Sequence, residues 1–342
     1  MIKDQLITEN FAIYNADCMD VVSALESESI DLSIYSPPFA GLYQYSSSPL
    51  DFSNCESKEK FIEQYAYLIK QISRVTKPGR ITAVHCTDVF DNTCRLWDLP
   101  HEIIKLHVNN GFEYRCRIGI RKEPLKVRMR TMVQSLMHKF VVEDMTKCFP
   151  SMPDYVLIFT KKGENAVPVE HPFGLTEFPY FGEWPVLPHF VTAFNNENQT
   201  EFTADDIWKY LNDTYADHAN PKTNKLSHYI WRRYADYMWD DIRIDNVLPY
   251  RDSKEDDDEK HVHPLQLDVI DRLVYMYSNP GEIVLTPFMG VGSEVYSPVS
   301  MGRKAIGIEL KASYYKQAVL NMAEAEKRFK KKQYFTTDIF DL

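Results

Sequence analysis

The segment Glu282–Glu309 restricts the possible folds more than any other part of the chain. It contains an apolar run at 282–285, a turn with Gly290 and Gly292, a helical stretch from 293, and a second apolar run that ends in Glu309. Glycine lets a ligand approach the backbone closely, and a carboxylate after the next strand can bind two ribose hydroxyls. Glu309 follows Gly290 by 19 residues, which is typical of nucleotide-binding folds. The segment therefore predicts a strand–turn–helix–strand unit that binds a nucleotide or a nucleoside.

One position of this fingerprint is not filled. Tyr296 stands where a dinucleotide-binding fold has its third glycine. A ligand that has a ribose but no pyrophosphate makes less use of the helix N-terminus. The turn therefore favours a nucleoside-type ligand, and an oxidoreductase that uses a dinucleotide is a remote alternative.

The rest of the chain alternates between predicted strands and predicted helices. Short apolar runs that end at polar loops predict strands, and apolar residues at a spacing of three and four predict helices. This alternation is typical of a doubly wound α/β sheet. The predicted strands cover 11–17, 30–35, 80–86, 112–120 and 154–160, and the predicted helices cover 20–25, 58–75, 101–110, 265–277 and 314–330.

The middle of the chain has a different composition. Prolines and aromatic residues are dense in residues 164–260, which include four of the five tryptophans. We expect an insertion with its own small core, and we expect Trp231 to belong to that core. The chain is thus predicted to divide into residues 1–163, residues 164–260 and residues 261–342.

Composition excludes several classes of protein. Of the 342 residues, 44% are hydrophobic and 26% are charged, as in folded globular proteins. No apolar run reaches the ~18 residues of a membrane span, and the N-terminus does not resemble a signal peptide. The six cysteines are scattered without metal-binding spacing, which predicts reduced thiols in a cytoplasmic protein and no metal site.

The charge of the chain is unevenly distributed. A net charge of −10 argues weakly against a nucleic-acid partner. A basic patch can nevertheless exist on an acidic protein, and basic residues gather between Arg115 and Arg130. Phosphate contact and an ordinary solvated surface are both open for them. The candidates for phosphate contact are Arg117, Arg121, Lys122, Lys126, Arg128 and Arg130.

A second informative feature is the sequence Ser36-Pro37-Pro38-Phe39, which follows the apolar run 30–35 directly. The prolines must end the strand, because proline has no N–H for the sheet and a fixed φ. The turn then holds the Ser36 hydroxyl and backbone carbonyls beside an aromatic ring. Such a set of acceptors suits a flat heterocycle with an amino group, although a proline-stiffened turn without function is equally open from this stretch alone.

These two features together resemble the signatures of the DNA amino-methyltransferases that use S-adenosylmethionine. Ser36-Pro37-Pro38-Phe39 is similar to their catalytic motif, and Pro287-Phe288-x-Gly290-x-Gly292 is similar to their cofactor motif. The order of the motifs resembles the β class, as does His263-Pro264-Leu265-Gln266. The resemblance covers about residues 11–160 and 261–325. It implies a Rossmann-like doubly wound methyltransferase sheet with 164–260 as an inserted target-recognition region.

The resemblance also implies roles for single residues. The catalytic residues would be Ser36, Pro37, Pro38 and Phe39. The residues that bind S-adenosylmethionine would be Asp17, Thr286, Pro287, Phe288, Gly290, Gly292, Ser293 and Glu309. Asp17 could instead cap the helix that follows it. Thr286 departs from the family pattern, which has an aspartate there, and brings no charge to the methionine ammonium.

The implied reaction transfers a methyl group to the exocyclic amine of a base that is flipped out of double-stranded DNA. Ser36 resembles the cytosine-N4 enzymes, whereas the loop 41–54 resembles orphan prophage enzymes that act on adenine. We take adenine N6 as the first expectation and cytosine N4 as the second. A non-catalytic DNA-binding module is a further alternative. The β class implies a homodimer, and His85 and His263 are expected to be structural.

Overall fold

The computed structural model describes residues 2–38, 58–90, 96–131, 133–172, 174–175, 188–215, 225–250, 253 and 264–340. The chain forms two compact units. The larger unit is Met1–Pro168 together with Ile242–Leu342, and the smaller unit is Val169–Asp241. The division at 163 and 260 that we expect from the sequence stays a prediction.

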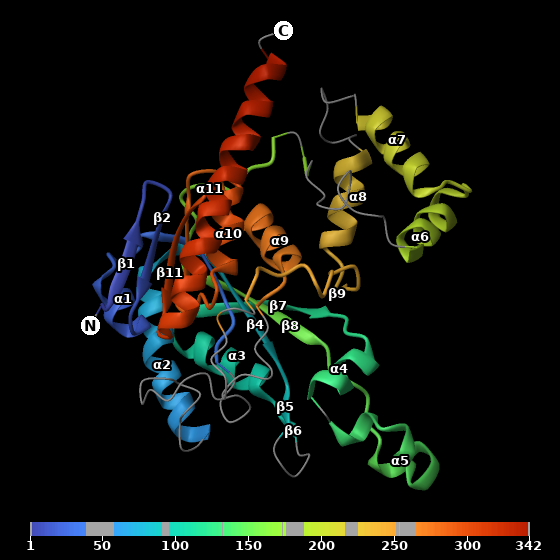
Figure 1. Ribbon diagram of the computed structural model, residues 1–342, viewed down its shortest axis with the longest axis horizontal. Helices are drawn as coiled ribbons and strands as arrows, with labels where there is room; N and C mark the ends of the chain where they lie inside the picture. Colours follow the sequence, from blue (N-terminus) through green and yellow to red (C-terminus); the bar gives the residue numbers. More distant parts are fainter. Residues whose placement is uncertain are drawn as a thin grey trace. The chain divides into compact units, whose positions relative to one another are not determined.

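A twisted sheet forms the centre of the larger unit (Figure 1). Its strands run in the order β1-β2-β11-β10-β3-β4-β8-β7. The five strands from β2 to β4 are parallel, while β1 and β8 run antiparallel to their neighbours. The strands are β1 (Asp4–Ile7), β2 (Phe11–Asn15), β3 (Ile30–Tyr35), β4 (Thr76–Thr87), β7 (Phe112–Ile120), β8 (Asp154–Lys161), β10 (Ile283–Thr286) and β11 (Lys304–Glu309). A separate pair, β5 (Val89–Phe90) and β6 (Leu96–Trp97), follows β4.

Helices cover both faces of the sheet, so the predicted doubly wound α/β fold is confirmed. One layer contains α1 (Cys18–Ala24), α2 (Lys58–Val75) and α3 (Leu99–Asn109), and the other contains α9 (Leu267–Tyr277), α10 (Ser293–Ser300) and α11 (Ala312–Phe340). Between β7 and β8 the chain forms α4 (Pro124–Thr131), η2 (Gln134–Leu136), α5 (His138–Glu143) and η3 (Met145–Lys147). We call this segment, residues 121–153, the arm; Figure 1 shows α4 and α5 beyond the ends of the two strands.

The start of β4 differs from the sequence prediction. Lys77-Pro-Gly79 was expected to lie between a helix and a strand that begins at residue 80. Instead α2 ends at Val75 and β4 begins at Thr76. Gly79 has a φ of +71°, and a Cβ there would lie 2.3 Å from the backbone nitrogen of Asn165. The prolyl-glycyl sequence therefore serves a close approach of two chain segments inside a longer strand.

A group of charges around the buried Asp31 and Arg80 connects three neighbouring strands. The Asp31 carboxylate on β3 accepts hydrogen bonds from the Ile283 N–H of β10 at 2.9 Å and from Lys77 Nζ at 2.6 Å. Arg80 of β4 donates from Nε to the Asp31 carbonyl at 3.0 Å, and its guanidinium pairs with Glu282. Buried ion pairs add little net stability but define one arrangement of their partners. This group fixes how β10, β3 and β4 lie beside one another.

The smaller unit contains α6 (Pro188–Asn198), α7 (Ala204–Tyr215), α8 (Lys225–Tyr234) and β9 (Met238–Trp239). Its buried residues include Phe194, Ile207 and Trp239. The expectation that Trp231 belongs to this core is wrong, because its side chain is 56% exposed. The buried face of α8 carries Ile230 and Tyr234, one helical turn apart, and Trp231 lies outside that stripe.

Candidate active site

The five parallel strands of the larger unit end at the same edge of the sheet, and most of the predicted site residues follow those ends. In α/β sheets ligands bind at this edge, where the chain turns to opposite sides of the sheet. Here that point lies between β10, which leads to β11, and β3, which leads to β4. In sheet order the residues at the edge are Asp17 after β2, Glu309 at the end of β11, Pro287 after β10, Ser36 after β3 and Asp88 after β4.

The glycine turn is fixed to Glu309 by backbone hydrogen bonds. The Gly290 N–H donates to Glu309 Oε2 at 2.9 Å, and the Lys311 N–H donates to Oε1 at 2.7 Å. Gly290 and Gly292 have φ values of +52° and +97°, a region that favours glycine. A Cβ on Gly290 would meet nothing within 4 Å, whereas one on Gly292 would lie 3.2 Å from Ala318 Cβ. Gly290 therefore faces open space, and Gly292 allows α10 to pack against α11.

The residues around this turn fit a nucleoside cofactor with several polar groups. Each Glu309 oxygen accepts one backbone N–H, and a carboxylate oxygen can accept more than one donor, such as a ribose hydroxyl. Thr286 Oγ1 and Ser293 Oγ are buried and have no hydrogen-bond partner among the described residues. Buried polar atoms are normally paired, so these two hydroxyls suit a polar ligand.

Glu294 is a buried acid beside the turn that the sequence reasoning missed. It is the second residue of α10 and is buried. Burial, together with the nearby Glu309 carboxylate, raises the pKa of Glu294 to about 8, so its carboxyl is neutral at pH 7. The signal in the sequence was an acid two residues after Gly292, next to the predicted site residue Ser293.

Asp17 has the capping role that the sequence left open. Its Oδ1 accepts the Met19 N–H at 2.9 Å and begins α1. This accounts for one oxygen of the carboxylate, and its role toward a cofactor stays a prediction.

The serine–proline turn begins at a firmly held residue. Tyr35, the last residue of β3, is buried, and its hydroxyl lies 3.0 Å from Nε2 of the buried His107 on α3. The Tyr35 ring meets the Phe288 ring edge-on, with centroids 6.1 Å apart. Ser36, Pro37 and Pro38 therefore begin next to the glycine turn, while Phe39 and the loop 41–54 lie outside the described residues.

His85 connects Ser36 to a buried carboxylate. Its Nδ1 lies 3.3 Å from Ser36 Oγ, and its Nε2 lies 3.0 Å from Asp154 Oδ2. Lys122 pairs with the same Asp154 oxygen. The sequence reasoning took His85 as structural and passed over Asp154. A usable signal was the place of His85 near the end of a buried strand, since that strand neighbours the one that precedes Ser36.

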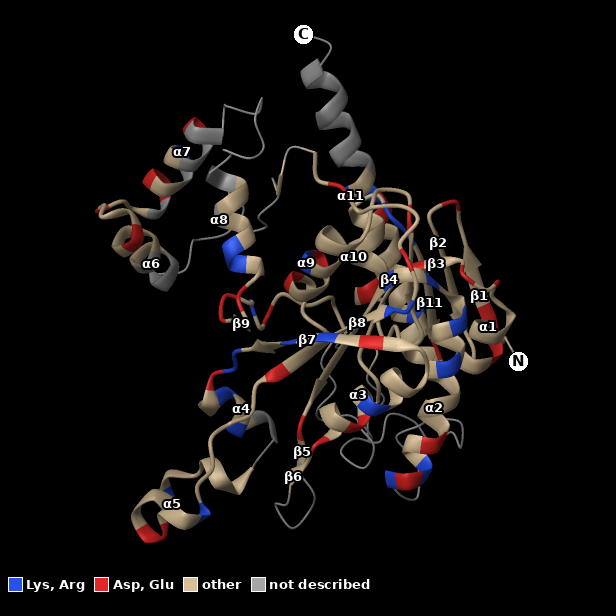
Figure 2. Cartoon of the chain, turned by 180° about the vertical axis from the view of Figure 1, so that it is seen from behind, with Lys and Arg blue, Asp and Glu red and all other residues tan. Residues whose placement is uncertain are grey.

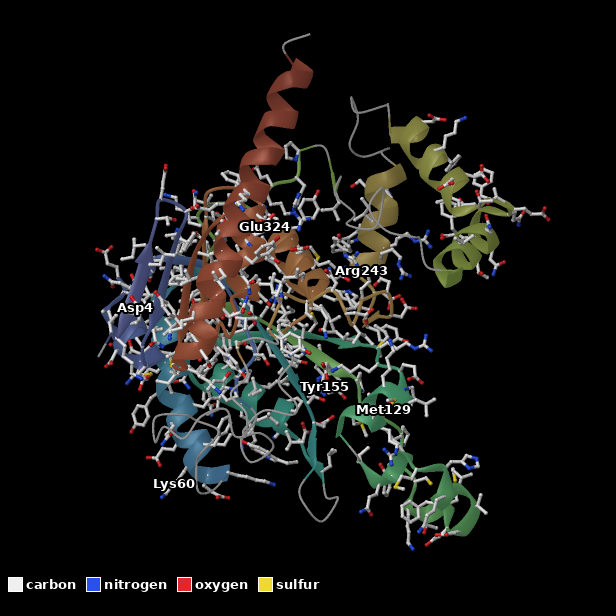
Figure 3. The ribbon with its side chains drawn as sticks, in the orientation of Figure 1. Asp4, Lys60, Met129, Tyr155, Arg243 and Glu324 are labelled. Carbon is white, nitrogen blue, oxygen red and sulfur yellow. The ribbon has the colours of Figure 1, made fainter. Side chains whose placement is uncertain are left out.

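The predicted phosphate-binding residues lie on β7 and the arm (Figure 2). Arg117, Arg121 and Lys126 are exposed, and Arg128 is half-buried. The Arg117 guanidinium lies 4.8 Å from the ring centroid of Tyr155, which is labelled in Figure 3. Lys122 differs, because it is only 22% exposed and pairs with Asp154. The side chain of Arg130 lies outside the described residues, as does His263.

The part of the chain that the structure describes has neither a membrane-spanning helix nor a cluster of metal ligands. None of its helices is long and apolar enough to cross a membrane. No group of three or more His, Cys, Asp or Glu side chains is placed there to hold a metal ion. Of the cysteines in this part, Cys18 and Cys86 are buried, Cys116 is exposed and Cys148 is half-buried; all four are free thiols.

Comparison with protein families agrees with the two motifs. The N6/N4 DNA methylase family model matches residues 30–320. The chain belongs to this DNA methylase family. The resemblance inferred from the motifs is thus confirmed, and so is S-adenosylmethionine as the cofactor, since the family depends on it.

Individual relatives of this DNA methylase are distant. The type II methyltransferase M1.MboII of Moraxella bovis is 21% identical over 323 residues, which are 91% of this chain and 97% of the relative. The DNA adenine methyltransferase YhdJ of Escherichia coli (strain K12) is 39% identical over 100 residues, 29% of this chain and 31% of the relative. The solved structure of the cytosine-N4-specific PvuII DNA methyltransferase is similar with a TM-score of 0.56 at 14% identity, covering 96% of this chain and 95% of that one. This last likeness shows the shared fold.

Proposed function

We propose that this DNA methylase is a cytoplasmic, site-specific enzyme that transfers a methyl group from S-adenosylmethionine to the N6 amine of adenine in double-stranded DNA. One observation carries the proposal. Ser36 follows β3, Phe288 follows β10, and these two strands are direct neighbours in the sheet. The serine–proline turn thus lies one strand away from the glycine turn. This suits direct transfer, because the target amine and the methyl group of the cofactor would be held close together.

The cofactor supplies an electrophilic sulfonium methyl group when it is bound. The protein must then orient the amine, whose lone pair is delocalised into the ring of the base. Ser36 Oγ and the Pro37 carbonyl accept the two N–H groups of the amine, which favours a pyramidal nitrogen with its lone pair directed at the methyl group. In this proposal Phe39 stacks on the flipped base, and Pro38 keeps the turn rigid.

Other residues hold the cofactor and the DNA. Glu309 would accept the ribose hydroxyls, the backbone at Gly290 would lie against the ligand, and Gly292 would keep the turn in shape. The remaining candidates for the cofactor are Asp17, Thr286, Pro287, Phe288 and Ser293. The exposed basic residues Arg117, Arg121 and Lys126, with Arg128 and Arg130, contact phosphates. Flipping the base costs a few kcal/mol, which DNA contacts must offset.

The two candidate functions differ in the base that receives the methyl group, adenine at N6 or cytosine at N4. The 39% identity to an adenine methyltransferase over 100 residues supports adenine N6. Ser36 supports cytosine N4, because serine in this position resembles the cytosine enzymes. A fold shared with a cytosine-N4 enzyme at 14% identity does not choose between them.

The test is incubation with isotope-labelled S-adenosylmethionine and unmethylated bacterial genomic DNA, followed by mass spectrometry of the nucleosides. We expect the label in N6-methyladenine. Label in N4-methylcytosine would replace the first candidate by the second, and DNA without label would contradict both. The homodimer implied by the β class also stays a prediction, which sedimentation velocity of the purified chain would check.

A further inference from the structure

The Ser36 hydroxyl lies beside the ring of His85, which belongs to neither motif and contacts a buried charge pair. Ser36 Oγ, the His85 ring and the Asp154 carboxylate form a chain with separations of 3.3 Å and 3.0 Å. The side chains of His85 and Asp154 are 11% and 8% exposed. They come from neighbouring strands, β4 and β8, and Lys122 at the start of the arm completes the group.

The charge of Asp154 determines which way the hydrogen bonds run. Burial acts to raise the pKa of Asp154, but the charge of Lys122 and the hydrogen bond from His85 outweigh it and hold the pKa well below its usual range. The carboxylate is therefore ionised and can only accept hydrogen bonds. Nε2 of His85 must then carry a proton, and in a neutral imidazole this leaves Nδ1 without one.

The state of Nδ1 fixes the Ser36 hydroxyl in turn. A serine hydroxyl can donate or accept. Beside an unprotonated Nδ1 the hydroxyl donates its proton to His85, and its lone pairs are directed elsewhere. A hydroxyl that instead donated to the target amine would occupy the lone pair that must attack the methyl group.

We propose that His85, held by Asp154 and Lys122, is a positioning residue that fixes the Ser36 hydroxyl as an acceptor for the target amine. The inference rests on the proposed function. It gives Lys122 a role in the active site in place of phosphate contact. It also explains how the Ser36 hydroxyl, which could donate or accept, only accepts from the target amine.

The kinetic test uses single-turnover transfer from labelled S-adenosylmethionine to unmethylated genomic DNA, which contains short recognition sites of any sequence. His85→Leu removes the acceptor for the hydroxyl, whereas His85→Asn can keep an acceptor near the Nδ1 position. We expect His85→Leu to slow transfer by about tenfold or more, the effect of losing one well-placed hydrogen bond. We expect His85→Asn to recover part of the rate, and cofactor affinity by calorimetry to stay within about twofold in both variants. The control is His101→Leu, on an exposed position of α3, which should transfer at the normal rate.

A double-mutant cycle shows whether His85 acts through Ser36. Ser36→Ala should lose most of the transfer while it still binds the cofactor. The variant Ser36→Ala/His85→Leu should be no slower than Ser36→Ala alone. Equal rates for His85→Leu and His101→Leu would overturn the inference, and so would fully multiplicative losses in the double variant. If the wild-type chain labels no DNA, the proposed function fails instead.

A spectroscopic measurement tests the direction of the hydrogen bonds at His85 without any turnover. Long-range ¹H–¹⁵N spectra of the histidine rings distinguish the two tautomers, and the signals missing in His85→Asn identify His85. We expect a ring protonated at Nε2 and bare at Nδ1 at about pH 8. A ring protonated at Nδ1 would overturn the inference even if His85→Leu failed to fold.

Discussion

At the scale of single residues, the glycine turn depends on the Glu309 carboxylate. Glu309 accepts two backbone N–H groups, one from the turn at Gly290 and one from Lys311. Hydrogen bonds to a charged group are stronger than neutral ones. Removal of the carboxylate would therefore loosen the turn, and under the proposed function it would also remove the acceptor for ribose hydroxyls.

We predict that Glu309→Ala weakens binding of S-adenosylmethionine by about tenfold or more, since a hydrogen bond to a charged group contributes ~1.5–3 kcal/mol. Isothermal titration calorimetry of the purified chain measures this directly. Glu324→Ala on α11, with a side chain 65% exposed, is the control and should bind normally. An unchanged dissociation constant in Glu309→Ala would remove Glu309 from the cofactor site.

At the scale of elements, α3 holds the end of β3 through a buried histidine. His107 donates from Nδ1 to the Ile103 carbonyl at 2.8 Å, so its Nε2 accepts the Tyr35 hydroxyl. Its ring stacks on Phe159 of β8, with centroids 4.1 Å apart. Burial lowers the pKa of His107 from 6.5 to about 4, against a smaller opposite effect of the Ile103 carbonyl. The residue directly before the serine–proline turn is thus anchored by a neutral imidazole.

This anchor predicts loss of stability in mild acid. Above pH 6.5 His107 is neutral in both the folded and the unfolded chain. Below it the unfolded chain takes up a proton that the folded chain refuses until about pH 4. Between pH 7 and pH 5 the free energy of unfolding should therefore fall by about 2 kcal/mol from this group. Urea unfolding at both pH values measures the fall, and His107→Gln should show a fall that is smaller by about that amount. Equal falls in the two proteins would contradict the prediction.

The arm is the element where the basic candidates gather. Glu123 accepts the N–H groups of Leu125 and Lys126 at 3.1 Å and 2.7 Å and so begins α4. The exposed Lys126 lies in the first turn of α4, five residues after the exposed Arg121 in the chain. Figure 3 labels Met129 on the same helix, an exposed apolar residue among these charges.

We predict that Arg121→Gln/Lys126→Gln weakens DNA binding and lowers its dependence on salt. Each lost phosphate contact reduces the slope of log K against log salt concentration by about 0.9. Fluorescence anisotropy with a labelled duplex at several salt concentrations should give a slope smaller by about 2. Lys327→Gln on α11, whose side chain is 74% exposed, is the matched control and should leave the slope unchanged. An unchanged slope in the double variant would mean that these residues face solvent alone.

The sequence predicted those features that depend on a single strand–helix–strand unit. Gly290 and Glu309 lie 19 residues apart, and their contact follows from the geometry of that unit. The contact between His85 and Asp154 spans 69 residues and depends on β8 pairing with β4 across the sheet. A strand that runs antiparallel beside a parallel set has no local signal for its neighbour. The helices of the arm were missed because they are short and α5 has no buried residue, so no apolar stripe marks them in the sequence.

At the scale of the whole molecule, the proposed chemistry belongs to the larger unit. Both motifs, His85 and Asp154 lie within Met1–Pro168 and Ile242–Leu342. The smaller unit, Val169–Asp241, contains none of the proposed cofactor or catalytic residues. This distribution is consistent with a target-recognition role for the smaller unit.

We predict that replacing residues 169–241 by a Gly/Ser linker keeps cofactor binding but abolishes methylation of DNA. Calorimetry with S-adenosylmethionine and label transfer to genomic DNA measure the two properties separately. Transfer at the normal rate and to the same sites would show that the smaller unit does not select the target. The wild-type chain under the same conditions is the reference.

The pairing of β3 with β10 has a consequence for how such a chain can vary. Leu32 is opposite Val284 and Ser33 is opposite Leu285, and the same count continued past the strand ends would set Ser36 opposite Phe288. One residue more or less in either strand would shift Ser36 relative to Phe288 by ~3.3 Å, about the rise of one strand residue. Connections between strands can lengthen, shorten or be exchanged without such a shift. A natural or engineered chimera of this chain therefore has to preserve the lengths of β3 and β10 and the charge group around Asp31 that connects them.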